Sequence, residues 1–133
     1  MTGAPTMTIK TGCDLVYLPK FQAALQRTPQ LLARLFTPHE LAHTNQITSL
    51  AGKFAVKEAV IKALPTVKAG DWHQIEVSHQ PSGKPTLKIV DSAQLNIVSS
   101  DISITHDGDY VLAVAVFLLG TYDDFKSNSA NQQ

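Results

Sequence analysis

The chain has 133 residues, the size of one ordinary domain. It is 44% hydrophobic and 17% charged, so it can bury a substantial core, and its acidic and basic residues cancel to a net charge of zero. A neutral chain has no bulk electrostatic attraction to nucleic acid or to a membrane surface, and no apolar stretch reaches transmembrane length. We therefore expect one domain over residues 8–120, flexible ends at 1–7 and 121–133, and neither nucleic-acid nor membrane partners.

The single cysteine, Cys13, excludes an intrachain disulfide. It lies in an apolar run, which predicts a buried thiol, and free thiols are typical of reducing compartments. The first residues lack the basic-then-apolar layout of a signal peptide. Together these features predict a cytoplasmic protein.

The first predicted element is a strand over residues 8–18, rich in β-type residues around Gly12. Asp14 interrupts its apolar pattern. An acid inside an apolar strand and close to a glycine is either a turn residue or a site residue, and the pattern alone favours neither.

Helices are predicted next. Pro19 suits a first helical turn and begins a helix that ends at Arg27. A shorter helix follows over residues 28–36. Thr37, Pro38 and Glu40 then give the pattern of a capping box, which predicts the start of another helix.

Residues 49–64 predict the longest helix, because they are rich in strong helix formers and Pro65 ends the segment. Apolar side chains cover almost its whole circumference, which is typical of a buried helix. Its charged residues fall on two separate edges, Lys53 with Lys57 and Glu58 with Lys62. The pattern allows two solvent-exposed stripes or a polar site built against a core helix.

The second half of the chain predicts antiparallel strands. Alternating residues predict a hairpin of strands over 73–79 and 84–90, and a short helix follows at 91–97. A strand over 99–105 and a turn at 106–109 precede residues 110–119, which are apolar on both faces and therefore predict a central strand. The order of elements predicts an α+β fold, with an antiparallel sheet packed on the long central helix.

Four stretches resemble the holo-[acyl-carrier-protein] synthase family, the small single-domain 4′-phosphopantetheinyl transferases. They are GCDLV at 12–16, FTPHEL at 36–41, LAGKFAVKEAVIKAL at 50–64, and ISITHD at 102–107 leading into YVLAVAV at 110–116. The resemblance covers about residues 9 to 118 and is most specific in the central helix. It implies an enzyme that moves the 4′-phosphopantetheine arm of coenzyme A to a serine of an apo acyl carrier protein or carrier domain, as in fatty acid biosynthesis, and releases 3′,5′-ADP.

The resemblance also implies which residues form the site. Asp14 and Glu58 match the family's Mg²⁺ carboxylates, and Lys62 matches the lysine that contacts the transferred phosphate, so these three are the expected catalytic residues. The expected coenzyme contacts are Lys53, Lys62, Pro85 and His106. Splitting a diphosphate requires cations that stabilise the developing charge, and Mg²⁺ usually takes only one or two protein carboxylates. Glu58 or metal-bound water could accept the serine proton, and Lys62 could stabilise charge or protonate the leaving group.

The resemblance further implies a homotrimer with sites between neighbouring protomers. We expect Glu58 and Lys62 to serve the chain's own metal site, whereas Lys53 and Lys57 face a neighbour's coenzyme, Lys57 as a solvated or interface charge. The segment 65–67 departs from the family's usual Gly-Thr-Gly, which puts the approach of its backbone to coenzyme A in doubt.

Two other functions stay open on the sequence. A degenerate trimer could bind coenzyme A without catalysis, and a purely structural trimer could use the helix charges in salt bridges. His106 alone could be a turn histidine satisfied by Asp107. The remaining histidines are expected at the surface. The intact set of two acids, a lysine and a histidine favours the enzyme.

Overall fold

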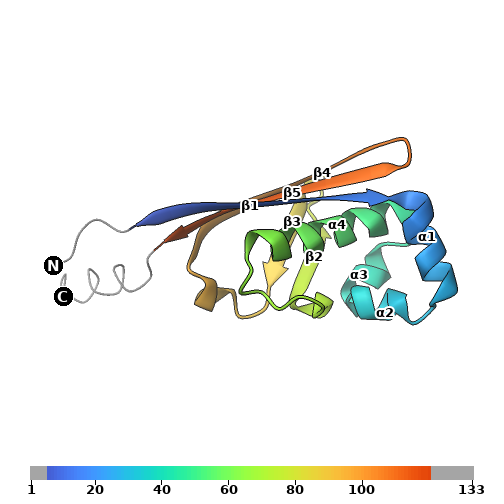
Figure 1. The fold of residues 1–133 in the computed structure, drawn as a ribbon, viewed down its shortest axis with the longest axis horizontal. Helices are drawn as coiled ribbons and strands as arrows, with labels where there is room; N and C mark the ends of the chain where they lie inside the picture. Colours follow the sequence, from blue (N-terminus) through green and yellow to red (C-terminus); the bar gives the residue numbers. More distant parts are fainter. Residues whose placement is uncertain (1–5, 121–133) are drawn as a thin grey trace.

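The computed structural model describes residues 6–120, so of the predicted flexible ends, residues 1–5 and 121–133 lie outside the described part. Figure 1 shows the order of the elements. They are β1 (Met7–Tyr17), α1 (Leu18–Arg27), α2 (Leu31–Leu35), α3 (Pro38–His43), α4 (Ile47–Ala63), the 3₁₀ turn η1 (Trp72–Gln74), β2 (Ile75–His79), β3 (Pro85–Ile89), the 3₁₀ turn η2 (Ser92–Leu95), β4 (Ile97–Asp107) and β5 (Tyr110–Gly120).

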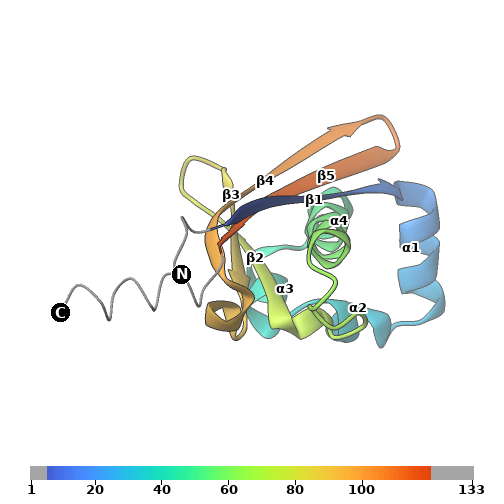
Figure 2. The same cartoon turned by 60° about the vertical axis from the view of Figure 1, so that its left-hand side comes forward.

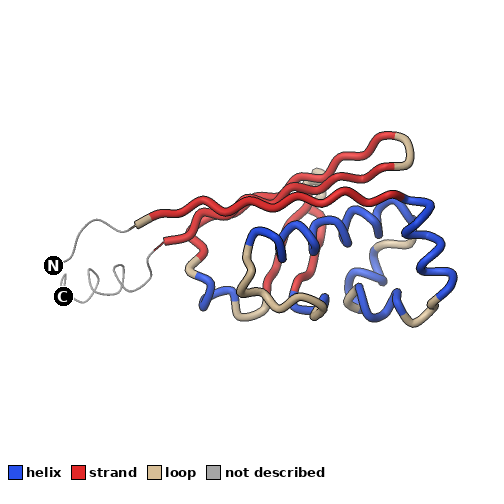
Figure 3. Tube along the Cα trace, in the orientation of Figure 1, coloured by secondary structure: helices blue, strands red, loops and turns tan. Residues whose placement is uncertain are grey.

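The strands form two antiparallel sheets (Figure 3). The larger has the order β1-β5-β4, so the strand predicted to be central from its apolar faces does lie in the middle. In this sheet Asp14 lies opposite Ala113, and Ala113 lies opposite Ile104. The smaller sheet pairs β2 with β3. The predicted α+β fold is confirmed.

Helix α4 packs along one face of the three-stranded sheet, between that sheet and the shorter helices (Figures 1 and 2). Small side chains on α4 allow this close packing, since Ala51, Ala55 and Ala59 are fully buried. Val56 and Val60 are buried as well, so α4 is enclosed on nearly all sides, as its apolar circumference predicted.

The structure can be compared with the helix and turn boundaries predicted from local sequence patterns. The capping box of α3 is confirmed, because the Glu40 amide donates to Thr37 Oγ1 at 3.2 Å and the Thr37 amide donates to Glu40 Oε1 at 2.9 Å. The predicted turn at 106–109 is shorter in the structure, where β4 continues to Asp107 and Gly108 turns with a φ of 56°. Within residues 6–120, no helix combines the length and the hydrophobicity needed to cross a membrane.

Cys13 is exposed, so the prediction of a buried thiol is wrong. Side chains alternate between the two faces of a strand. Gly12 and Asp14 point toward α4, whereas Cys13 lies on the outer face of the sheet beside Val114. The apolar run around Cys13 reflects an apolar outer face that no other part of residues 6–120 covers.

Candidate active site

Asp14 on β1 and Lys62 on α4 meet where the strand crosses the helix. Lys62 Nζ lies 3.0 Å from Asp14 Oδ1 and donates to the carbonyl oxygen of Cys13 at 3.0 Å. Glu58, one helical turn before Lys62, lines the same cavity. The structure therefore brings together the three residues predicted to be catalytic, from elements more than 40 positions apart in the sequence.

Gly12 allows this convergence. A Cβ atom built on Gly12 would overlap the carbonyl oxygen of Ala59 and lie 2.9 Å from the amide nitrogen of Ala63. The backbones of β1 and α4 thus touch at Gly12, and residues 12 and 14 point to the same side of the strand. This contact holds Asp14 against the helical turn that carries Glu58 and Lys62.

The three charges affect each other's ionisation. Burial raises the pKa of the Glu58 carboxyl, and the negative charge of Asp14 raises it further, while Lys62 opposes both effects. The hydrogen bond to Asp14 is the main cause of a raised pKa at Lys62. Two acids close enough to repel each other favour a bound cation between them.

The donor set suits magnesium. Among the described residues there is no group of three or more His, Cys, Asp or Glu side chains that could hold a metal ion, so a site here has only the two carboxylates as protein ligands. Mg²⁺ is commonly bound by one or two carboxylates, with waters and substrate phosphates completing the shell, whereas zinc sites usually have three or four protein ligands, most of them nitrogen or sulfur. Asp14 and Glu58 therefore fit Mg²⁺.

The cavity beside these charges has a volume of about 660 Å³. One wall is aromatic: the rings of Phe21 and Phe54 are 5.5 Å apart, and those of Phe54 and Trp72 are 5.4 Å apart. Lys20 and Arg34 also line the cavity and are exposed. The sequence pattern did not reveal this wall, because an aromatic residue on a buried helix, such as Phe54, is typical of a core, and Trp72 lies 18 positions after Phe54 along the chain.

A second pocket of about 500 Å³ lies at the other end of α4. It contains the predicted coenzyme contacts Pro85 and His106, together with Gly52 and His79. His106 is exposed on β4 rather than within a turn. This pocket shares no lining residue with the cavity of Asp14, so the chain has two separate candidate sites.

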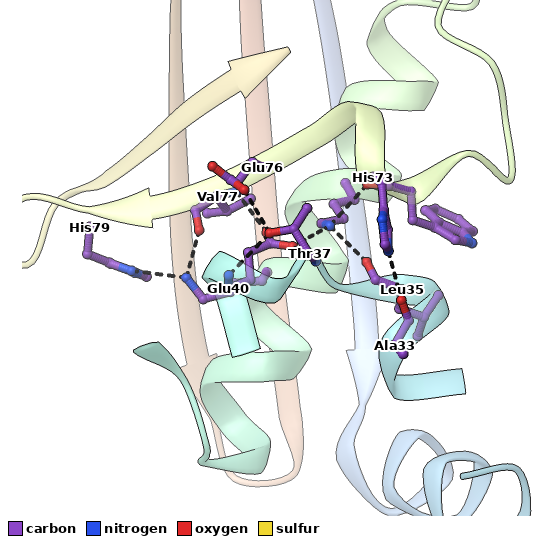
Figure 4. A network of polar contacts seen from close by, with 11 residues as sticks. Ala33, Leu35, Thr37, Glu40, His73, Glu76, Val77 and His79 are labelled. Carbon is purple, nitrogen blue, oxygen red and sulfur yellow. Dashed lines mark hydrogen bonds and ion pairs between the residues drawn. The ribbon is translucent and has the colours of Figure 1, made fainter. Parts of the chain in front are cut away.

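Lys53 and Lys57 lie on a different edge of α4 from Glu58, as predicted, but they do not face outward, because both are buried. Figure 4 shows part of the surrounding polar network, in which Thr37 and Glu40 lie beside Glu76 and Val77. Lys57 is fully buried and lies 2.6 Å from Glu40 Oε1, so its prediction as a solvated or interface charge is wrong. Lys53 is 2% exposed and donates to the carbonyl oxygen of Val77 at 2.8 Å. A helix pattern cannot reveal that Glu40, from another helix, partners Lys57.

Burial and neighbouring charges also shift the pKa values of the two lysines on this edge. Burial lowers the pKa of Lys57, and the hydrogen bond to Glu40 opposes that effect. Burial lowers the pKa of Lys53 in the same way, again opposed by Glu40. Lys53 Nζ lies 3.5 Å from Nδ1 of His79, and His79 lines the second pocket. Lys53 therefore places its amino group next to that pocket.

The altered segment after α4 forms a closed turn. The amide of Val67 donates to the carbonyl oxygen of Leu64 at 2.9 Å, and the Val67 side chain is buried. His39, His43, His73 and His79 are exposed, as predicted.

The fold and this arrangement of acids and lysine define a class of transferase domain, and comparisons with known proteins specify it. Residues 10–115 match the 4′-phosphopantetheinyl transferase superfamily, and the chain belongs to this family. A holo-[acyl-carrier-protein] synthase of Frankia alni is 39% identical over 115 residues, covering 81% of this chain and 95% of that protein. Another, of Shouchella clausii, is 40% identical over 119 residues, covering 83% and 97%.

Solved structures agree with the sequence comparisons. The crystal structure of the Helicobacter pylori holo-[acyl-carrier-protein] synthase in complex with coenzyme A has a TM-score of 0.74 and 29% identity, and the match covers 80% of this chain and 98% of that one. The Neisseria meningitidis enzyme gives a TM-score of 0.73 at 28% identity, covering 81% and 96%. The resemblance stated from the sequence is confirmed.

Proposed function

We propose that this protein is a holo-[acyl-carrier-protein] synthase that transfers the 4′-phosphopantetheine arm of coenzyme A to a serine of an apo acyl carrier protein, with Mg²⁺ as its cofactor. The observation that carries the proposal is the convergence of Asp14, Glu58 and Lys62 beside one cavity. The proposal includes a cytoplasmic location, to which an exposed free thiol at Cys13 is suited.

In the proposed reaction the serine oxygen attacks the phosphorus attached to pantetheine. A new P–O bond forms, Glu58 or water accepts the serine proton, the bond to the bridging diphosphate oxygen breaks, and 3′,5′-ADP leaves. Mg²⁺ held by Asp14 and Glu58 would stabilise the negative charge of the diphosphate. Lys62, which lies beside Asp14, would act as a cationic donor to the phosphate oxygens or protonate the leaving group.

The second pocket is proposed to hold the nucleotide end of coenzyme A. His106 and Pro85 line it, and Lys53 adds positive charge beneath it next to His79. Since the two pockets of one protomer are separate, a complete site requires that the cavity of one chain face the second pocket of a neighbour. Because Lys53 lies beside His79 of the same chain, we assign its charge to the coenzyme held in the second pocket of its own protomer.

The outer face of the three-stranded sheet supports a homotrimer. Antiparallel sheets exposed to water on one face usually carry polar residues there. Here that face carries large exposed apolar side chains, including Ile9 at 69% and Leu15 at 59% exposure. Tyr17 and Tyr110 lie side by side on it, with ring centroids 5.2 Å apart. Contiguous apolar surface of this kind marks a protein interface, and we assign it to other copies of this chain.

The cavity near Asp14 is proposed as the side from which the carrier protein enters. Its exposed cations, Lys20 and Arg34, suit an acidic carrier helix, and its aromatic wall offers apolar contact area. The carrier is a discrete protein or a domain of a larger synthase.

A transfer assay tests the proposal directly. Coenzyme A labelled on pantetheine, apo acyl carrier protein and Mg²⁺ are incubated with the protein, and the labelled carrier is measured. We expect transfer that stops when EDTA is added. Binding of coenzyme A without transfer to any carrier would instead identify a degenerate binding module.

The proposed assembly has a separate test. Val114, at the centre of the outer sheet face, lies opposite Cys13 and Ser103. Val114→Lys places a charge on this apolar surface, and we expect sedimentation analysis to show a trimer for the unchanged protein and a smaller species for the variant. A monomeric unchanged protein would contradict the assembly.

A further inference from the structure

The aromatic wall of the cavity is formed by segments that need an anchor. Trp72 is the first residue of the short turn η1, which follows a loop without helix or strand. Leu35 is the last residue of the five-residue helix α2. Both side chains line the cavity beside Asp14, Glu58 and Lys62. Short elements of this kind hold a wall in place only when tertiary contacts fix them.

Lys57 supplies such contacts from the long helix α4. Its ammonium donates to the carbonyl oxygen of Leu35 at 2.8 Å and to that of Trp72 at 3.1 Å. Its third hydrogen bond is the ion pair with Glu40 at 2.6 Å, and it also lies 5.4 Å from the centroid of the Phe36 ring. A lysine ammonium has three donors, so all three are used, and two of them hold residues of the cavity wall.

Glu40 completes the junction. Its Oε1 accepts from Lys57 and from the Thr37 amide, while its Oε2 accepts from the Val77 amide at 2.8 Å. The ion pair thus joins α3 and β2 to α4 and to both wall residues. Within residues 6–120, no buried side-chain polar atom lacks a partner, so the junction is fully satisfied and has one defined geometry.

We propose that Lys57 and Glu40 are positioning residues, which set the place of the Leu35–Trp72 wall and thereby the affinity for the acceptor protein, without touching substrate. A buried ion pair is weak evidence for stability in itself, because apolar residues often replace it at no loss. A donor is required at position 57 because an apolar side chain could not hold two backbone carbonyls. The naming of the acceptor rests on the proposed function; the positioning of the wall does not.

Trp72 provides a direct readout, since it is the only tryptophan of the chain. In Glu40→Gln we expect Trp72 emission to shift to the red and acrylamide quenching to increase in the folded protein. The shorter carboxylate of Glu40→Asp cannot reach both Lys57 and the Val77 amide, so this milder variant should give a smaller change of the same sign. We also expect a several-fold rise in KM for apo acyl carrier protein in both variants, with kcat nearly unchanged, because Asp14, Glu58 and Lys62 stay in place.

A stability-matched control separates positioning from general destabilisation. Phe117 is fully buried on β5 and does not line the cavity. Phe117→Leu should lower the free energy of unfolding while leaving native Trp72 emission and acceptor KM as in the unchanged protein. Unaltered Trp72 emission in Glu40→Gln and Glu40→Asp would overturn the proposal, as would an equal rise of KM in Phe117→Leu. Absence of transfer by the unchanged protein would refute the proposed function alone, because the fluorescence comparison needs no substrate.

Discussion

The two charged edges of α4 differ in how the charges of their side chains are compensated. On one edge, Lys57 is sealed in the core with Glu40, and its charge is matched by a carboxylate and two carbonyls. On the other, burial and the like charge of nearby Asp14 raise the pKa of Glu58, and the edge opens into a cavity. Lys57 is fully paired within the fold and stabilises the wall of the site. Glu58 lies next to a like charge, so it is available to bind a ligand.

The largest expected effect breaks the sealed edge. Glu40→Gln removes the carboxylate and leaves the Lys57 ammonium buried without an anion, which should cost about 3–5 kcal/mol in the free energy of unfolding. Denaturant titration measures this loss. Glu76→Gln is the matched control, since Glu76 is half-buried and accepts a hydrogen bond from Thr37 Oγ1 at 2.7 Å, and it should cost much less. Equal losses in both variants would refute the distinct role of Glu40.

The same kind of conservative change beside the open edge should slow the reaction strongly and leave the fold intact. Asp14→Asn and Glu58→Gln each remove an anionic ligand, and we expect kcat to fall by about 10²–10³-fold, the scale of losing one electrostatic stabiliser of the transition state. Asp91→Asn serves as the control, because Asp91 is exposed and has a left-handed φ of 58° that asparagine also adopts. Near-normal turnover in either site variant would exclude its proposed role.

A third change moves the open edge without altering its charges. Gly12→Ala forces a methyl group against the Ala59 carbonyl, and overpacking of this kind costs about 1–3 kcal/mol. Gly52→Ala tests the same substitution where the new Cβ would lie 3.3 Å from the movable Cγ2 of Ile104, and the gain in helix propensity there offsets the crowding. Urea unfolding should therefore show a clear loss only for Gly12→Ala, and similar losses for the two variants would contradict the close contact of β1 with α4.

The smallest effect concerns stability without metal. Because the pKa of Glu58 is raised in the folded state, its ionised form at neutral pH destabilises the fold. In EDTA, Glu58→Gln should therefore raise Tm at pH 7. The gain should be complete above the folded pKa of Glu58 and shrink as pH falls through it, vanishing once the carboxyl is protonated in both folded and unfolded chains. A Tm at pH 7 below that of the unchanged protein would show that the Glu58 charge is not in conflict.

Local patterns predicted most of the fold. The capping box at Thr37, the long apolar helix and the central position of β5 follow from spacing alone, because each depends on residues close in sequence. The resemblance added Asp14, Glu58 and Lys62, and the structure brings them together. The partners of Lys53 and Lys57 could not be predicted, since Val77 and Glu40 reach them only through tertiary packing.

The same limit explains the error at Cys13. An apolar run predicts burial of some kind, but it does not tell whether the covering surface belongs to the same chain. The run around Cys13 lies on the outer face of the sheet, where the proposed neighbours of the trimer would cover it.

The central claim is that Asp14 and Glu58 bind one divalent ion together. Titration with Mn²⁺, a spectroscopic substitute for Mg²⁺, followed by electron paramagnetic resonance, measures this binding without any turnover. The account predicts one site per chain in the presence of coenzyme A, weakened strongly and to a similar extent by Asp14→Asn and by Glu58→Gln, and unchanged in Asp91→Asn. Full binding in either site variant would show that the two carboxylates do not share an ion.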